Sequence, residues 1–314
     1  MSNKLKLSVS GAALALLLAA GSASSVQAAD VVAEPGCTLS GSVMAGYMYD
    51  WQNIDPDFTS EDLDIDWSTP FGEGAGLVTC GGFNVQADVA YYAHSGDISD
   101  FSSSDVDLDQ TNTHIGGAVF YRDPASWAGG LSASWISQDI GAKDIDVFRV
   151  GLFGEFYLDD VFTLGGSAYY YNTDWPEQKD EDGFELAAWG KFYATPDLAF
   201  TLRGDVLLAD IDSFGENADW DGWAITGDGE YLVWDQGLSV FAGARYAERT
   251  LDFDNDDSFD IDDFQVFAGI KFYFGQDGTL IERQRTGTVD NTSVFNEKLP
   301  RLFGGGSMVA VDAQ

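Results

Sequence analysis

Positive charge is scarce in this sequence: 15 lysines and arginines stand against 52 aspartates and glutamates, for a formal net charge of −37. Nucleic-acid binding needs basic surfaces, so this balance excludes that class of function. Proline is scarce too, at 7 residues, whereas aromatic residues make up 14% of the chain. A disordered acidic chain would lack aromatic residues. The composition therefore predicts an ordered protein rich in β-structure.

The chain has no apolar run long enough to cross a membrane as a helix, and its longest such run lies within the first 29 residues. Lys4 and Lys6 precede the stretch "GAALALLLAAG", and "SVQAAD" offers small residues for cleavage after Ala28 or Ala29. A membrane helix needs about 20 apolar residues, and this stretch has roughly half that number. We therefore predict a signal peptide over residues 1–29, an exported mature chain, and membrane insertion only through strands.

Apolar and polar residues alternate in steps of two along about a dozen segments of the mature chain. In "FNVQADVAYY", for example, Phe83, Val85 and Val89 share one side, while Gln86 and Asp88 share the other. A strand with one apolar and one polar face has this period, and no segment carries the apolar stripe of a helix. The mature chain is therefore predicted to be all-β.

The connections between these segments alternate between short and long. The short ones read "CGG", "RDPASW", "LDDV", "TPD" and "WDQG". The long ones hold 34 of the 52 acidic residues, in the windows 50–66, 97–109, 139–146, 174–185, 210–221 and 248–263. In an up-and-down antiparallel sheet every second connection lies on the same side, so the acidic windows gather at one end. Aromatic residues gather beside the short turns.

Short turns at one end, long loops at the other and an aromatic girdle are typical of an outer-membrane barrel. We predict a single up-and-down antiparallel transmembrane β-barrel of about 12 strands over residues 38–274, with extracellular loops and periplasmic termini. Residues 63–79 fit either one kinked strand or a long first loop. A secreted, acid-rich β-sandwich would also alternate, but it would not explain why the acidic residues gather at one end.

The signal segment, "GFNVQADVAYY" after a glycine turn, the aromatic hairpins and "FAGIKFYFG" before a polar tail resemble the porin-like outer-membrane proteins of alphaproteobacteria. The resemblance spans most of residues 38–285 and implies a barrel with a porin-type role. The strand ending at Phe274 also resembles the mark that the barrel assembly machinery reads on terminal strands. Residues 30–37 are then an N-terminal periplasmic segment, and residues 275–314 a periplasmic tail that either plugs the lumen or contacts peptidoglycan.

Charged residues with the inward parity are the candidate lining of a channel. They are Arg149, Lys191, Arg203, Arg245 and Lys271, with Asp88, Glu155, Glu185, Asp205, Asp228 and Glu230. Opposite charges inside a narrow barrel either fill it with a salt-bridged network or line a channel and set its ion preference. About 12 strands lie between the filled barrels of 8 strands and the open porins of 16, so both alternatives stand and we favour the channel.

The window 248–263 contains a candidate cation site. Asp252, Asp254, Asp256 and Asp260 offer hard oxygen ligands of the kind that Ca²⁺ or Mg²⁺ takes. The pattern lacks the sixth-position glycine and the closing glutamate of a helix–loop–helix calcium site, so a solvated acidic loop is the alternative. Divalent cations would also bridge such loops to lipopolysaccharide phosphates. We expect no other cofactor.

The two cysteines and two histidines support a structural rather than a catalytic interpretation. Cys37 precedes the first strand and Cys80 lies in the "CGG" turn, so a disulfide between them is expected in an oxidising compartment. His94 and His114 both take the inward parity, whereas a lipid-cleaving Ser–His pair must face the bilayer. No nucleophile motif with an orienting third group is present. We therefore predict no enzyme.

The sequence thus predicts a narrow, porin-like passive diffusion channel in the outer membrane of a Gram-negative bacterium. The acidic loops would raise the local cation concentration at its mouth, so we expect it to favour cations. The expected partners are outer-membrane lipid, lipopolysaccharide and the barrel assembly machinery. The alternative is a closed barrel with a surface-structural or adhesion role through its acidic extracellular loops.

Overall fold

A computed structural model describes residues 36–56, 63–98, 106–140, 143–174, 180–212, 217–253, 258–300, 303–304 and 307–308 of the 314-residue chain. The predicted signal peptide, residues 1–29, lies outside the described residues. Within the described ranges, no helix is long and apolar enough to cross a membrane.

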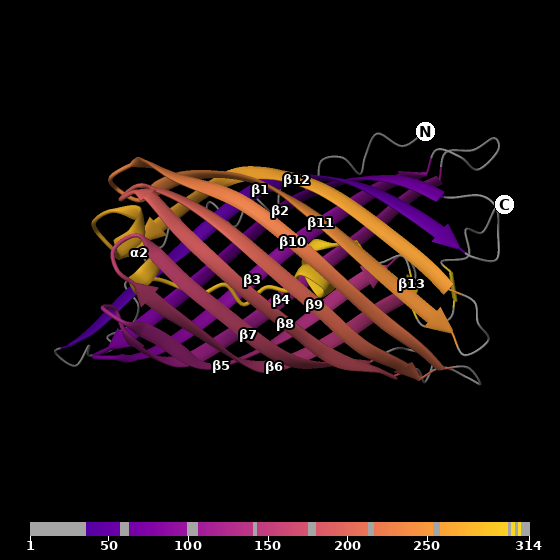
Figure 1. Cartoon of the computed structure of the whole chain (residues 1–314), viewed down its shortest axis with the longest axis horizontal. Coiled ribbons are helices and arrows are strands. Elements are labelled where there is room, and N and C mark those ends of the chain that lie inside the picture. The colour runs from indigo at the N-terminus through magenta and orange to yellow at the C-terminus, as the bar shows by residue number, and fades with distance from the viewer. Residues whose placement is uncertain are drawn as a thin grey trace.

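Twelve antiparallel strands form one closed barrel in which each strand pairs with its neighbours in sequence (Figure 1). β1 pairs with both β2 and β12, which closes the ring. The strands are β1 (Cys37–Pro56), β2 (Leu63–Cys80), β3 (Phe83–Ile98), β4 (Val106–Asp123), β5 (Trp127–Ile140), β6 (Lys143–Leu158), β7 (Phe162–Asp174), β8 (Asp180–Thr195), β9 (Leu198–Asp212), β10 (Asn217–Trp234), β11 (Leu238–Phe253) and β12 (Ser258–Phe274). The predicted twelve-stranded up-and-down barrel is confirmed.

The ambiguous stretch at residues 63–79 is a single strand, β2, rather than a long first loop. Its pairing with β3 runs from Ile65 to Ser68 and again from Phe71 to Cys80, with a break at Thr69 and Pro70. Proline has no N–H to donate to the ladder, which accounts for the break. The register is the same on both sides of it, so the strand carries no bulge here.

The short turns lie together at one end of the barrel, as predicted. In the first of them, Gly81 has φ +62°, a conformation that glycine adopts without steric cost. Cys37 and Cys80 are register partners on β1 and β2 at this end, and they form the predicted disulfide.

Outward aromatic side chains form two girdles, one near each end of the strands. Several strands carry an exposed aromatic at both levels, always eight residues apart, as in Phe148 and Phe156 of β6 or Phe184 and Phe192 of β8. Eight residues cover about 27 Å along a strand and about 21 Å along the axis at a tilt near 40°. This matches the apolar band of roughly 25 Å on outer-membrane barrels. The second girdle, at the long-loop end, was not predicted.

The long acidic loops are a correction to the sequence-based prediction. The strands are 13 to 20 residues long, beyond the roughly 9–11 that a tilted strand needs to cross a bilayer. They run on into the acidic windows, so that β11 ends only at Phe253 and β12 already begins at Ser258. Many of the acidic residues therefore lie on the barrel wall and not in loops.

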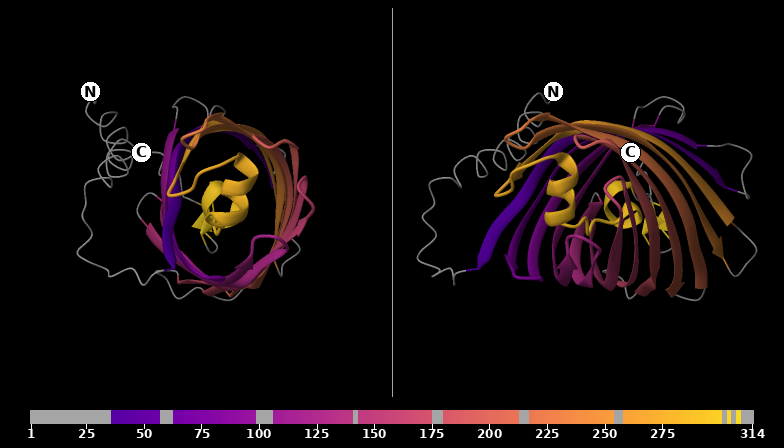
Figure 2. Two further views of the ribbon diagram at one scale, coloured as in Figure 1. Left: turned by 90° about the vertical axis from the view of Figure 1, so that its left-hand side faces the viewer. Right: turned by 60° about the vertical axis from the view of Figure 1, so that its left-hand side comes forward.

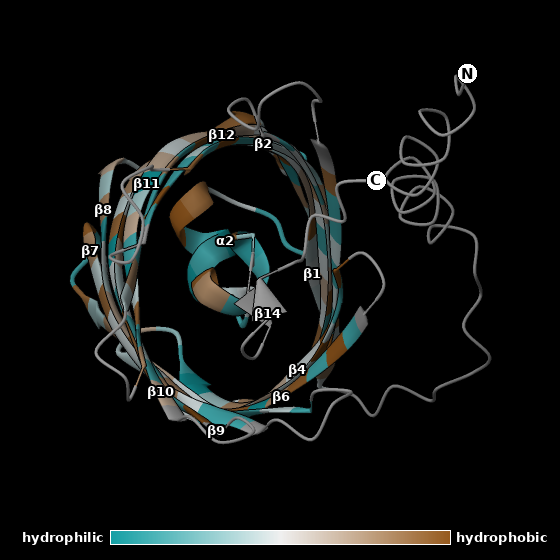
Figure 3. Ribbon diagram, turned by 90° about the vertical axis from the view of Figure 1, so that its right-hand side faces the viewer, coloured by the Kyte–Doolittle hydropathy of each residue, from teal (hydrophilic) through white to brown (hydrophobic). Residues whose placement is uncertain are grey.

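In these strand extensions the polarity of the two faces is reversed. On β12, Phe259 and Ile261 are buried inside, whereas Asp260 is exposed outside. Past the girdle aromatic Phe264, apolar side chains such as Val266 point outward and Gln265 points inward. The membrane part has an apolar exterior and a polar lumen, whereas the extension has a water-facing exterior and an apolar core. The ribbon in Figure 3 is coloured by residue hydropathy, and both hydrophilic and hydrophobic residues occur along the strands.

The exposed aspartates on this outer wall form a ring that we call the acidic collar. It consists of Asp55, Asp64, Asp66, Asp97, Asp109, Asp139, Asp144, Asp146, Asp174, Asp210, Asp219, Asp221, Asp252 and Asp260.

After β12 the chain turns into the barrel instead of leaving it. Helix α2 (Leu280–Thr286) lies at the short-turn end, and the π-helical turn η1 (Val294–Lys298) lies deeper inside the ring (Figure 2). A two-stranded piece, β13 (Phe303–Gly304) with β14 (Ser307–Met308), follows towards the other end. Of the two alternatives left open for the tail, its described part up to Pro300 occupies the lumen. We call residues 275–300 the lumenal segment.

Candidate functional site

The lumenal segment enters the barrel at the short-turn end through α2. Thr279 and Glu282 form a reciprocal capping box that starts this helix. The backbone and side-chain hydrogen bonds from Thr279 hold the pKa of Glu282 below its usual range. On the opposite face, Leu280 is fully buried in an apolar cluster with Tyr193 and Leu232. The cap and this cluster fix α2 against the barrel mouth.

Arg283 ties α2 to the turns around it. Its guanidinium donates to the backbone carbonyl of Asp235, in the turn after β10, at 2.6 Å, and to those of Gln276 and Gly278. The side chain is fully buried. Three carbonyl acceptors therefore compensate for the water that this cation loses on burial.

Beyond α2 the segment runs down the lumen, and inward side chains of several strands hold its backbone. Gln86 of β3 pairs with Val289 in both directions, donating to its carbonyl and accepting from its N–H, each at 2.8 Å. Arg122 donates to the carbonyl of Gly287 at 2.6 Å. The hydroxyls of Ser42 and Thr288 lie 3.0 Å apart. The backbone of the segment is therefore hydrogen-bonded here to side chains of the barrel wall and not to the backbone of a strand.

Glu297 of η1 sits fully buried among basic groups of the wall. Its Oε1 lies 2.9 Å from Nδ1 of His114 and 3.7 Å from Nη1 of Arg149. The other ring nitrogen of His114 lies 2.7 Å from Oδ2 of Asp88, so the imidazole bridges two carboxylates. His114 and Arg149 come from β4 and β6, which places Glu297 against both strands.

A second carboxylate, Glu185 of β8, holds η1 from another side of the lumen. It accepts hydrogen bonds from Ser293 Oγ at 2.5 Å and from Asn296 Nδ2, and it pairs with Arg149 at 2.6 Å. Arg149 thereby connects Glu185 to Glu297. The π-helical turn is thus held by charged and polar groups that are almost completely buried.

The turn η1 also fills the apolar core at the long-loop end. Val294, Phe295 and Leu299 are buried in one cluster with inward side chains of the strand extensions. The strand members of that cluster include Ile54, Ile65, Trp67, Ile136, Ile145, Val147, Leu207, Ile211, Trp220, Leu251, Phe259 and Ile261. At this end the lumen is packed like the interior of a soluble protein and not lined like a pore.

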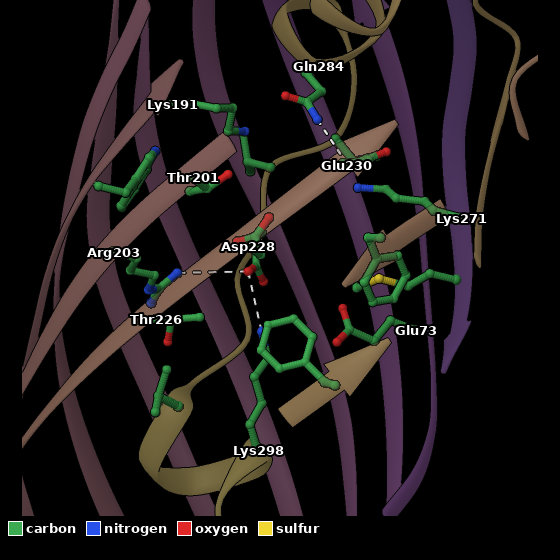
Figure 4. Close-up of a pocket in the computed structure, with 18 of the residues that line it drawn as sticks. Glu73, Lys191, Thr201, Arg203, Thr226, Asp228, Glu230, Lys271, Gln284 and Lys298 are labelled. Carbon is green, nitrogen blue, oxygen red and sulfur yellow. Dashed lines mark hydrogen bonds and ion pairs between the residues drawn. The ribbon is translucent and has the colours of Figure 1, made fainter. Parts of the chain in front are cut away.

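Between α2 and η1 the lumen contains a cavity of about 230 Å³ (Figure 4). Its charged lining is balanced, with five acidic and five basic side chains: Glu73, Glu155, Asp228, Glu230 and Asp290, with Lys191, Arg203, Arg245, Lys271 and Lys298. A smaller cavity of about 110 Å³ lies beside it, lined in part by Asp88 and His114. These cavities are the space that the lumenal segment leaves in the membrane part of the barrel.

The structure brings together the eleven residues predicted to line a channel. Seven of them line the larger cavity, namely Glu155, Lys191, Arg203, Asp228, Glu230, Arg245 and Lys271. Asp88 lines the smaller cavity, while Arg149, Glu185 and Asp205 lie around η1. Both alternatives from the sequence are partly present, since Arg203 pairs with Asp205 at 2.7 Å while Lys191 faces open space.

Sequence reasoning missed the partners that the lumenal segment supplies. Oδ2 of Asp290 lies 3.8 Å from Nη1 of Arg203 and 3.5 Å from Nζ of Lys298. Glu297 contacts His114. The one available signal was the charge balance of the tail, which is far less acidic than the windows. A buried pair at the long-loop end, Arg249 with Asp263 at 2.7 Å, was missed as well.

The four aspartates of the candidate cation site fall in two groups. Asp252 and Asp260 are exposed on the outer wall, and Asp260 accepts a hydrogen bond from Thr250 at 2.8 Å. Asp254 and Asp256 lie outside the described residues. Among the residues whose side chains are described, no group of three or more His, Cys, Asp or Glu forms a metal-binding cluster.

No protein-family model matches the chain, and no curated protein matches its sequence. Solved structures that resemble it are porin-like outer-membrane β-barrels. An outer membrane channel from Pseudomonas putida F1 is similar with a TM-score of 0.51 and 11% identity, over 77% of this chain and 97% of that one. The beta domain of the Bordetella autotransporter BrkA is similar with a TM-score of 0.46 and 13% identity, over 75% and 100%. At such identities the likeness concerns the fold alone.

Proposed function

We propose that this protein is a narrow diffusion channel of the outer membrane whose own lumenal segment occupies part of the path. The observation that supports the proposal best is the cavity of about 230 Å³ at membrane depth, lined by charged groups from most of the barrel. If the lumen served only to be filled, close packing would be expected there, and an open cavity lined by charged groups would not. The barrel fold and the apolar band on its outer surface support a location in the outer membrane.

For orientation we keep the sequence-based proposal: the long-loop end outside the cell and the short-turn end in the periplasm, in a porin-like protein of the alphaproteobacterial kind. The acidic collar would then meet lipopolysaccharide, with divalent cations such as Ca²⁺ or Mg²⁺ bridging aspartates to lipid phosphates. The strand ending at Phe274 would be read by the barrel assembly machinery.

In this proposal the cation preference comes from the collar and not from the cavity. The cavity lining is balanced in charge, so it gives no strong preference of its own. The collar carries exposed aspartates on eleven of the twelve strands at one mouth. A ring of one sign raises the local concentration of counter-ions, and this effect is screened by salt.

A planar-bilayer measurement under a salt gradient tests this proposal. We expect discrete channel openings. At 0.1 M salt, where the Debye length is about 10 Å, their reversal potential should show selectivity for cations over anions. The bias should shrink at 1 M, where that length is about 3 Å. Replacing Asp139, Asp144 and Asp146 of the collar by Asn should reduce the bias without loss of folding, because all three are exposed and form no ion pair among the described residues.

The matched control removes three exposed aspartates at the other end, with Asp160, Asp235 and Asp277 changed to Asn. It should alter the bias less, because these residues do not belong to a closed ring. An anion bias in the unmodified protein would contradict the role of the collar.

The second candidate function is a closed barrel with a surface-structural or adhesion role. One observation favours it: the apolar cluster around Phe295 packs the lumen at the collar end. This alternative predicts electrical silence both with and without the lumenal segment. The channel proposal predicts measurable conductance both with and without the lumenal segment.

A further inference from the structure

The larger cavity has two chemically different walls. One is apolar and is formed by a cluster with Met48, Phe71 and Tyr92, against which Met44, Phe241 and Phe267 pack. Within it, Phe71 stacks on Tyr92 with ring centroids 5.8 Å apart. The other wall is polar and comes from β8, β9 and β10. β2 and β8 are six strands apart in the ring of twelve, so these parts of the two walls face each other, whereas β10 of the polar wall adjoins β11, which carries Phe241 of the apolar wall.

On the polar wall, Lys191, Thr201 and Asp228 form one row across three neighbouring strands. Lys191 is the register partner of Thr201, and Thr201 is the partner of Asp228. Neighbouring strands are about 4.8 Å apart, so the ammonium-bearing and carboxylate-bearing residues are about 10 Å apart at the backbone. Figure 4 shows these three side chains around the open space.

Neither end of this row has an oppositely charged side chain within 4.0 Å among the described residues, although Lys191 and Lys298 act on Asp228, and Glu155 acts on Lys191, from farther away. Among the described residues, Lys191 makes no ion pair within 4.0 Å, and the hydrogen-bond partner of Asp228 is the neutral hydroxyl of Thr201. By contrast, Arg203 in the same cavity is paired with Asp205 and Asp290. A partly buried ammonium and carboxylate with no charged partner each lose hydration that a ligand with both charges would restore.

The same row continues from Asp228 into the apolar wall. The next register partners are Gly243, then Phe267, then Met48. A side chain at Gly243 would collide with the Phe267 ring, since an added Cβ would come within 2.5 Å of it. The absence of that side chain lets the ring lie next to Asp228, so charged and apolar groups meet along one row.

We propose that this cavity binds a zwitterionic α-amino acid with an apolar or aromatic side chain. The α-carboxylate pairs with Lys191, the α-ammonium pairs with Asp228, and the side chain contacts Phe267 and the apolar wall. A volume of about 230 Å³ is below the roughly 300–1,000 Å³ of drug-sized pockets, which restricts the ligand to one small molecule. The inference names the solute of the proposed channel and so rests on that proposal.

Isothermal titration of the folded full-length protein in detergent with L-phenylalanine tests the inference. Three analogues separate the contributions: 2-phenylethylamine lacks the carboxylate, 3-phenylpropionate lacks the ammonium, and glycine lacks the side chain. We expect phenylalanine to bind at least about tenfold more tightly than each of them, because each analogue leaves one of the three proposed contacts unused. Glycine binding as tightly as phenylalanine would overturn the proposal.

Two variants give a crossed pattern that general loss of structure would not produce. Lys191→Gln should weaken phenylalanine and phenylpropionate but leave phenylethylamine unchanged. Asp228→Asn should weaken phenylalanine and phenylethylamine but leave phenylpropionate unchanged. Lys191→Arg, which keeps the charge, should retain more phenylalanine binding than Lys191→Gln. If both neutral variants weakened all ligands equally, the assignment of charges would be wrong.

The amino-acid site and the channel are separate proposals, and the experiments can overturn either one without the other. Discrete conductance in a protein that binds no phenylalanine would overturn the amino-acid site and leave the channel. A silent protein with the crossed binding pattern would overturn the channel and leave a binding site in a closed barrel.

Discussion

Ending the chain after Gln276 should raise the single-channel conductance at least ~3-fold, since a ring of 12 strands is wider than the 8-strand ring that side chains alone can fill. The truncation removes α2, η1 and every side chain that the lumenal segment places in the barrel. It leaves the twelve-strand hydrogen-bond ladder intact, because β1 pairs with β12 without help from the segment. The measurement is conductance in a planar bilayer at fixed salt.

Folding of the truncated protein can be checked separately from its conductance. Unboiled protein should migrate differently from boiled protein on a gel, as for the full-length chain. A shorter truncation after Pro300 is the matched control, since it keeps all of the lumenal segment; its conductance should equal that of the full chain. Unchanged conductance in a folded protein truncated after Gln276 would show that the segment does not obstruct the path.

Glu297→Lys should release the lumenal segment from the barrel without removing it. The substitution places an ammonium beside Arg149 and His114, where a carboxylate now lies fully buried. Breaking a buried pair by removing one partner costs about 3–5 kcal/mol, and a like charge adds repulsion. Glu297→Gln keeps the size and hydrogen-bonding capacity, so it should have a smaller effect in the same direction.

Two measurements report release. Trypsin should cut the segment at Lys298, which lies in η1 next to residue 297, in the Glu297→Lys protein. The conductance should rise towards that of the truncated protein. Glu282→Gln is the control, because Glu282 lies in the same segment but is exposed outside the polar cluster. A Glu297→Lys protein that resists trypsin as the unmodified one does would contradict the anchoring role of Glu297.

The barrel could be predicted from sequence because its determinants are local. Alternation at every second residue, short turns and the placement of aromatics each depend on near neighbours in the chain. The parity of Phe83 or Lys191, for instance, follows from the strand that contains it. The disulfide followed as well, since Cys37 and Cys80 lie at the same end of adjacent strands.

The reversal of polarity beyond the girdle was readable but was interpreted as loop. In "DLDIDW", Ile65 and Trp67 point inward while Asp64 and Asp66 point outward. The alternation is as regular there as in the membrane part, but the apolar residues take the inner face. An interpretation that equated acidic windows with loops overlooked a strand with water outside and an apolar core inside.

The position of the lumenal segment could not be derived from its sequence. Its contacts with the wall depend on residues from distant strands, such as Gln138 of β5 donating to the carbonyl of Asn296 and Arg249 of β11 donating to that of Pro300. Such pairing to backbone carbonyls leaves no pattern in the segment itself. The capping box at Thr279 and Glu282 does leave one, and it marks the start of α2.

The position of the segment inside the barrel is the central claim, and a double-cysteine variant tests it most directly. The hydroxyls of Ser42 on β1 and Thr288 lie 3.0 Å apart, so Ser42→Cys with Thr288→Cys should form a disulfide in folded protein. Peptide mapping by mass spectrometry separates this bond from the native one. Tyr47→Cys with Thr288→Cys is the control, because Tyr47 is exposed on the outer face of the same strand. A high yield of the 42–288 bond and none of the 47–288 bond is the predicted result. Free thiols at 42 and 288 in correctly folded barrels would contradict a segment held inside the lumen.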